Sequence, residues 1–185
     1  MPKLLAFAAT YRADSTNEKL LRVASQLARS KGAEVTSVAF HAFDAPMLRE
    51  DQPMHPLPQG VSHCAELLHA SDGFLLAMPE YNWSMPAAVK NLIDWLSVDP
   101  SKPLAGKTAL LMCASSSIRG GIMGLTQLRV PLELLHVWVY PQIIGVGKAG
   151  DVIRDDHLAN EKDHRFLTDS VADFVQKTRM ISTIT

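Results

Sequence analysis

The chain has 185 residues, 47% hydrophobic and 20% charged, with two cysteines far apart at Cys64 and Cys113. A chain of this length buries roughly 70% of the surface of its unfolded form and needs no structural metal, although one bridge between the cysteines remains open. The lack of any Cys-x-x-Cys pair or Cys/His cluster argues against zinc and thiol redox chemistry, and a formal net charge of −1 without a basic run argues against a nucleic-acid partner. We expect a single domain over residues 1–185.

The N-terminal apolar run is too short for a secretion signal. No other stretch approaches the roughly 20 uninterrupted apolar residues of a membrane span. We therefore expect a cytoplasmic location and no membrane partner.

Strand-length apolar runs alternate with helix-length segments, a rhythm typical of α/β domains. The first run, Lys3–Ala9, is apolar throughout, as in a strand buried on both faces. A helix is predicted next, with Ser15 or Asn17 as its cap and Gly32 as its end. The remaining predicted elements are strands at Glu34–Phe40, Asp72–Met78, Lys107–Cys113 and Val137–Ile144, and helices at Val61–Ala70, Pro86–Leu96, Gly121–Leu135 and Asn160–Arg179.

Two segments stand out within this order. Pro131 is expected to bend or break the helix that contains it. The connection His41–Gly60 carries four prolines and is long enough to be functional or mobile.

Five strands with helical crossovers predict an α/β fold, a doubly wound five-stranded parallel sheet with helices on both faces. Such sheets bind ligands beyond the carboxyl ends of their strands. The loops that could carry chemistry therefore follow Ala8, Met78, Cys113 and Ile144.

The loop after the first strand combines several groups that bind phosphate. Its side chains include the hydroxyls of Thr10, Ser15 and Thr16, the amide of Asn17 and the guanidinium of Arg12. They stand where a helix begins, and the free N–H groups of a helix N-terminus attract anions. The alternative, that Ser15 or Asn17 only caps the helix, is equally good on those residues alone. Arg12 in the same turn favours phosphate.

The segment from Pro79 to Ser97 reads Pro-Glu-Tyr-Asn, then Pro86, then Lys-Asn-Leu-Ile-Asp-Trp-Leu-Ser. This pattern resembles the signature of the NADPH-dependent FMN reductase family, flavodoxin-fold enzymes that include quinone, chromate and azo-dye reductases. The family's Ser- and Gly-rich third flavin loop is similar to Ser115–Gly121. The resemblance covers roughly residues 3 to 178.

The family's phosphate loop is also matched here. Arg12, Ser15 and Asn17 stand at its conserved positions, while Ala9 and Thr10 replace Gly and Ser. The resemblance implies a flavodoxin-like enzyme with FMN as cofactor and NADPH or NADH as co-substrate.

The implied contacts fall into three groups. Thr10, Arg12, Ser15, Thr16 and Asn17 would form the phosphate loop, Pro79, Glu80, Tyr81 and Asn82 would follow the isoalloxazine mainly through backbone groups, and Ser115, Ser117, Gly120 and Gly121 would belong to the loop near its pyrimidine end. No catalytic side chain is expected, because the cofactor supplies the reactivity. Tyr81 or Trp83 either packs near the ring or is buried, and Trp95 is expected to serve helix packing.

The resemblance implies that hydride passes from nicotinamide to FMN and then to a small-molecule acceptor: a quinone, azo compound, metal oxyanion or free flavin. A homodimer or homotetramer is expected. Two alternatives remain. A flavodoxin-like electron carrier would normally present a strongly acidic face, whereas this chain is nearly neutral. A flavin-free scaffold or regulatory protein has its support in Ala9.

One further motif, Gly145–Gly150, fits the dinucleotide pattern Gly-x-Gly-x-x-Gly after a predicted strand. The charged segment that follows does not open an apolar helix, so a flexible loop is the favoured interpretation.

Overall fold

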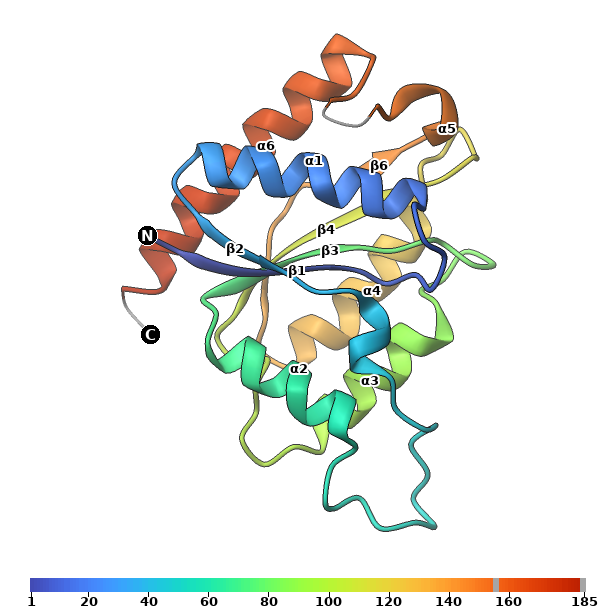
Figure 1. Ribbon diagram of the computed structural model, residues 1–185, viewed down its shortest axis with the longest axis vertical. Coiled ribbons are helices and arrows are strands. Elements are labelled where there is room, and N and C mark those ends of the chain that lie inside the picture. The colour runs from blue at the N-terminus through green and yellow to red at the C-terminus, as the bar shows by residue number, and fades with distance from the viewer. Residues whose placement is uncertain (155–156, 184–185) are drawn as a thin grey trace.

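A parallel sheet forms the centre of the molecule (Figure 1). The computed structural model describes residues 1–154 and 157–183. The strands are β1 (Lys3–Ala8), β2 (Glu34–Ser37), β3 (Gly73–Ala77), β4 (Thr108–Ala114), β5 (Trp138–Val139) and β6 (Ile144–Val146). Their order is β2-β1-β3-β4-β5, with β6 also paired to β4, and every pairing is parallel.

The helices are α1 (Thr16–Ser30), α2 (Gln59–His69), α3 (Ala87–Ser97), α4 (Ile122–Leu134), α5 (Ala149–Val152) and α6 (Glu161–Ile181), with a short 3-10 helix, η1, at Phe40–Phe43. Helices α1 and α6 cover one face of the sheet, and α2, α3 and α4 cover the other (Figure 1). The doubly wound arrangement expected from the sequence is confirmed.

Both faces of the central strands are buried, which explains their unbroken apolar runs. In β1, Leu5 and Phe7 join the core beneath α2 and α3, while Leu4 and Ala6 join the core beneath α1 and α6. Successive side chains of a strand point to opposite faces, so a strand covered on both sides must be apolar at every position. All residues of β3 and β4 are buried for the same reason.

The fifth predicted strand is wrong as a continuous element. β5 pairs with Thr108 and Ala109 of β4, and pairing resumes only at β6, opposite Met112. Pro141 lies in the gap and has no N–H for a ladder bond. Arg129 of α4 donates to the Tyr140 carbonyl at 2.9 Å, which satisfies the last carbonyl before the interruption.

Two other expectations change. The second strand ends at Ser37 rather than Phe40, because Phe40 and Phe43 turn into the core as part of η1. Helix α4 continues through Pro131 to Leu134, so the expected break does not occur. Leu128 and Leu132 anchor the helix on either side of Pro131 by core packing, which outweighs the missing N–H.

No helix among residues 1–154 and 157–183 is long and apolar enough to cross a membrane.

Candidate functional site

A cavity of about 420 Å³ opens at the carboxyl edge of the sheet, where β1, β3 and β4 end. Its walls come from the loops after these three strands and from the start of α5. The lining residues are Thr10, Arg12, Ser15, Thr16, Asn17, Pro79, Glu80, Tyr81, Ala114, Ser115, Ser116, Ala149 and Gly150. This edge is where doubly wound sheets bind ligands, and the volume lies in the usual range for small-molecule sites.

Most residues expected from the sequence meet in this cavity. All five residues expected to bind phosphate line it, namely Thr10, Arg12, Ser15, Thr16 and Asn17. Asn82, Ser117, Gly120 and Gly121 do not line it. Ala114, Ser116, Ala149 and Gly150 line it without having been predicted, so the structure shifts the third wall toward α5.

Ser15 caps α1 through a reciprocal pair of hydrogen bonds. Its hydroxyl accepts from the Glu18 N–H at 3.2 Å, and the Glu18 carboxylate accepts from the Ser15 N–H at 3.3 Å. The capping interpretation of Ser15 is therefore confirmed. The N–H groups of Thr16 and Asn17 belong to the first turn, where no partner exists within the helix. They stand at the positive end of the helix dipole, a setting that favours an anion.

The Asn17 amide ties this loop to the end of β4. Its Nδ2 donates to the Ala114 carbonyl at 3.0 Å, and its Oδ1 accepts from the Ala114 N–H at 2.8 Å. Both bonds are buried. What Asn17 offers a ligand is therefore its backbone N–H, because its side chain already has two partners.

Tyr11 links the same loop to the segment after η1. Its hydroxyl donates to the Asp44 carboxylate at 2.6 Å, and its ring packs edge-on against Phe40. Burial raises the pKa of Tyr11 to about 12, and the hydrogen bond and negative charge of Asp44 act in the same direction. The phenol is thus held in its neutral, donating form.

The Glu80 carboxylate is directed to α4. Its Oε2 accepts from the Gly124 N–H at 2.6 Å, in the first turn of a helix whose own N-cap, Gly121, provides no side chain. A carboxylate at a helix N-terminus satisfies a free N–H and matches the dipole. The carboxylate of Glu80 is therefore engaged by α4 and is not directed at the cavity.

The segment Tyr81–Ser84 forms a tight reversal. The Tyr81 N–H donates to the Ser84 carbonyl at 3.0 Å, and the Ser84 N–H donates to the Tyr81 carbonyl at 2.9 Å. Asn82 and Trp83, the two central residues, have φ of 49° and 64°. This left-handed conformation is strained for a residue as bulky as tryptophan. The two hydrogen bonds therefore close a defined turn just after β3.

Both aromatic side chains of this turn are exposed, Tyr81 by 59% and Trp83 by 57%, so burial is the wrong alternative for them. The Arg119 guanidinium lies 4.9 Å from the centroid of the Trp83 ring. A cation over an aromatic face fixes the orientation of the ring.

The wall contributed by Ser115–Ser117 is held by β6 and α5. The Ser115 N–H donates to the Val146 carbonyl at 3.0 Å, and the Ala149 N–H donates to the Ser115 carbonyl at 3.0 Å. The stretch Gly145–Gly150 is therefore an ordered strand and helix start, and the flexible-loop interpretation was wrong. A Cβ on Gly145 would lie 2.8 Å from the Gly120 carbonyl, so these glycines allow two backbones to touch.

The chain matches the family described as NADPH-dependent FMN reductase over residues 2–151. The chain belongs to the NADPH-dependent FMN reductase family. This membership confirms the resemblance seen in the sequence.

Curated relatives agree. A quinone reductase of Escherichia coli (strain K12) is 38% identical over 105 residues, which span 55% of this chain and 56% of that protein. The alignment thus covers about half the length of that relative. An NAD(P)H-dependent FMN reductase of Pseudomonas aeruginosa is 30% identical over 176 residues, covering 95% of this chain and 90% of that protein.

A solved structure also resembles this FMN reductase family member along its whole length. The flavoenzyme NAD(P)H:(acceptor) oxidoreductase FerB from Paracoccus denitrificans superposes with a TM-score of 0.83 at 25% identity, covering 97% of this chain and 98% of that one. A flavodoxin from the domain Archaea, at 10% identity and a TM-score of 0.62, shares the fold alone.

The family motif Lys-Asn-x-Ile-Asp-Trp is structural here. The Asn91 amide donates to the Pro46 carbonyl at 3.0 Å and accepts from the Leu48 N–H at 2.8 Å. Trp95, which is buried, donates its Nε1–H to the Pro46 carbonyl at 2.8 Å. The motif anchors the start of the long proline-rich connection, and the packing role expected for Trp95 is confirmed.

The two cysteines are buried free thiols, so the bridge left open by the sequence does not form. Burial raises the pKa of Cys64 and of Cys113 to about 12. Both thiols are therefore kept protonated, which makes them poor nucleophiles.

Proposed function

We propose that this chain is an FMN-dependent NAD(P)H oxidoreductase that reduces a small-molecule acceptor such as a quinone, an azo compound, a metal oxyanion or free flavin. The observation that carries the proposal is the cavity at the sheet edge. It joins the Arg12 guanidinium and the N-terminus of α1 to the ends of β3 and β4.

The residues present fit FMN. The Thr16 and Asn17 N–H groups, the Arg12 guanidinium and the Thr10 hydroxyl would hold the phosphate. Thr10 already accepts from the Arg12 N–H at 3.2 Å, which leaves its own O–H free to donate. The loop that carries Pro79, Glu80, Tyr81 and Asn82 would follow the ring system, and the loop that carries Ser115, Ser117, Gly120 and Gly121 would serve the pyrimidine end.

Bound FMN supplies hydride acceptance from reduced nicotinamide and electron delivery to the acceptor. The chain's part is to bind and orient. The helix terminus and Arg12 fix one end of the cofactor, and the Asn17–Ala114 pair keeps that end in register with β4. No side chain is assigned as an acid or nucleophile.

The flavin-free alternative loses its support. Ala9 is buried in the core on the α2 and α3 side and does not line the cavity. Its φ is not in the left-handed region among the described residues, so an alanine is accommodated without strain. We also keep as proposals a single domain over residues 1–185, a cytoplasmic location and a homodimer or homotetramer.

The first experiment is the visible absorption spectrum of the purified protein before and after FMN, followed by anaerobic NADPH. We expect flavin peaks that bleach. A colourless protein that neither binds nor reduces FMN would sink the proposal.

Arg12→Ala tests the phosphate assignment. FMN affinity should fall about 10- to 100-fold, because a charge-assisted pair to phosphate is lost, while the thermal midpoint changes little. Flavin fluorescence titration measures the affinity. Lys31→Ala, at the opposite end of α1, is the matched control and should bind FMN as the parent does. Equal affinities for both variants would contradict the role of Arg12.

A further inference from the structure

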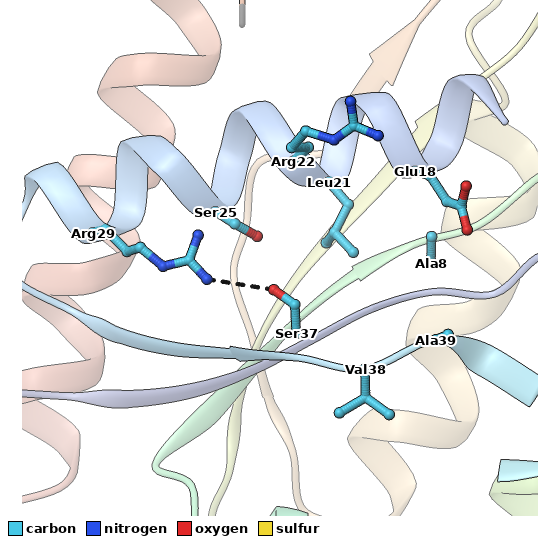
Figure 2. Close-up of a pocket in the computed structure, with 9 residues that line it drawn as sticks. All are labelled: Ala8, Glu18, Leu21, Arg22, Ser25, Arg29, Ser37, Val38 and Ala39. Carbon is cyan, nitrogen blue, oxygen red and sulfur yellow. Dashed lines mark hydrogen bonds between the residues drawn. The ribbon is translucent and has the colours of Figure 1, made fainter. Parts of the chain in front are cut away.

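A second cavity, of about 320 Å³, lies between α1 and the edge strand β2 (Figure 2). It is lined by Ala8, Glu18, Leu21, Arg22, Ser25, Arg29, Ser37, Val38 and Ala39. None of these residues lines the cavity assigned to FMN. The first cavity contacts the N-terminal end of α1 and the second contacts residues from Glu18 to Arg29, so a ligand in one does not require the residues of the other.

Ser25 is the feature that the core packing leaves unexplained. Its side chain is 2% exposed, and its Oγ has no hydrogen-bond partner within the described residues. Figure 2 shows the hydroxyl directed from α1 into the space above β2. Buried hydroxyls are nearly always bonded, often to a carbonyl one turn back in the helix. A group from outside the chain would satisfy this one.

Two arginines flank Ser25 on the same side of α1. Arg22, Ser25 and Arg29 are spaced by three and four residues, which places their backbone positions on one helix face. Figure 2 shows Arg29 reaching toward Ser37, whereas the Arg22 guanidinium extends away from β2. Arg29 donates from Nη2 to the Val35 carbonyl at 2.9 Å, with the Ser37 hydroxyl at 3.5 Å. A guanidinium has five N–H donors, so Arg29 keeps donors for a ligand.

Arg22 is held more loosely. Its guanidinium lies 3.9 Å from the Asp14 carboxylate, at the far edge of the contact distance for an ion pair. Glu18, the acidic residue of the lining, already accepts from the Ser15 N–H. Two guanidinium groups and one carboxylate leave a formal charge of +1 around the cavity, which favours an anion.

We propose that this second cavity binds the phosphate monoester of a small molecule. Arg29 and the Ser25 hydroxyl supply donors to the phosphate, and the half-exposed Arg22 side chain would turn from Asp14 toward it, since guanidinium groups recognise phosphate in a bidentate manner. Leu21 and Ala8, which belong to the core beneath α1, offer apolar surface to the rest of the ligand. The volume exceeds the needs of inorganic phosphate and reaches the lower range of small-molecule sites.

Two kinds of ligand carry such a phosphate monoester. One is the 2′-phosphate of NADPH, which rests on the proposed function. The other is a separate phosphorylated metabolite. The experiment below distinguishes them.

Binding is measured by calorimetry on the FMN-loaded protein, titrated with inorganic phosphate and with adenosine 2′-monophosphate. Because FMN fills the first cavity, binding reports the second. We expect Arg22→Gln and Arg29→Gln each to weaken binding about tenfold or more. Lys31→Gln removes the same charge two residues beyond Arg29 but outside the cavity, and it should change binding less than about twofold.

Ser25→Ala separates ligand binding from packing. It should weaken binding about three- to tenfold and leave the thermal midpoint of the ligand-free protein equal or higher, because an unpaired buried hydroxyl is removed. A lower midpoint together with unchanged binding would show a packing role only and overturn the part given to Ser25.

Kinetics identify the source. A higher KM for NADPH with an unchanged KM for NADH in Arg22→Gln assigns the site to the co-substrate. Unchanged values for both, with adenosine monophosphate binding still lost, assign it to a separate metabolite.

Two results overturn the proposal: no binding of either probe, or binding that Arg12→Gln abolishes while the Arg22 and Arg29 variants do not. If the protein fails to retain FMN, the same titrations in an Arg12→Gln background still test the second cavity, so its failure is distinguishable from failure of the flavin assignment.

Discussion

At the residue scale, the candidate site depends on side chains that fasten loops to one another as well as on those that face the cavity. Tyr11, Asn17 and Asn91 each join segments distant in sequence, to Asp44, Ala114 and the 45–48 segment respectively. Such residues set the positions of the loops before any ligand enters.

The Tyr11–Asp44 contact predicts a pH effect. The pKa of Tyr11 is raised in the folded protein from 10.0 to about 12. Because the pKa is raised in the folded state, the contact contributes its full stabilisation of the fold below pH 10. That contribution is lost as the pH rises through about 12. In an alkaline absorbance titration, Asp44→Asn should lower the pKa of Tyr11 toward its ordinary value. Tyr140→Phe removes the other phenol with a raised pKa and serves as the background. A Tyr11 pKa that ignores Asp44→Asn would contradict the contact.

Residue types at the phosphate loop could be predicted because capping and anion binding need hydroxyls, N–H groups and arginine at a helix start. Which of these residues caps the helix, which links two loops and which faces the anion cannot be read from the sequence. Ser15 caps, Asn17 bonds to Ala114, and Arg12 is left for the anion. Partners 97 positions away, as for Asn17, have no local signal.

At the element scale, Glu80 couples the loop after β3 to the start of α4. Glu80→Gln keeps the shape but removes the charge at the helix N-terminus, so we expect the free energy of unfolding to fall by about 0.5–2 kcal/mol. Urea denaturation measures it. Glu133→Gln, at the other end of α4, should cost less, because a negative charge there opposes the dipole. Equal losses would argue against the cap.

Helix α3 anchors the long connection through Asn91. Asn91→Ala removes the acceptor of the Leu48 N–H and the donors to the Ala45 and Pro46 carbonyls. The Leu48 amide should then exchange with solvent about fivefold faster or more, since one such hydrogen bond contributes about 1 kcal/mol. Hydrogen exchange by NMR checks this. Lys90→Ala, on the same helix but exposed, should leave the Leu48 amide protected.

The central strands and most helices were predictable from apolar runs and from the glycine, proline and capping residues that bound them. The fifth strand was not, because Val137–Ile144 is apolar enough to suggest one strand while Pro141 interrupts the ladder. The start of α5 escaped for a related reason. The glycines that precede it suggest freedom, whereas Gly145, in β6, lies in close contact with the Gly120 backbone.

At the scale of the whole molecule, α4 leaves an apolar surface unpartnered. Val130 and Leu134, one turn apart on this helix, are exposed. Neighbouring exposed apolar residues are typical of interfaces, and we propose that a second copy of the chain packs here in the expected homodimer or homotetramer.

Substitution of Val130 and Leu134 by aspartate should therefore convert an oligomer to monomer, because like charges would face each other across a symmetric interface. Sedimentation velocity measures the mass. Met47→Asp, an exposed apolar residue on the proline-rich connection, is the control and should leave the assembly intact. A parent protein that already sediments as a monomer would refute the interface.

The hydrogen bonds between Asn17 and Ala114 also bear on the rate of cofactor uptake. They join the start of α1 to the end of β4, 97 positions away, while the chain folds. The walls of the cavity are therefore assembled before the cofactor arrives. Association then requires no loop to be ordered at the moment of encounter, and the cost of immobilising those residues has already been met in folding. Uptake of flavin should follow a single bimolecular phase, without a slow rearrangement after contact.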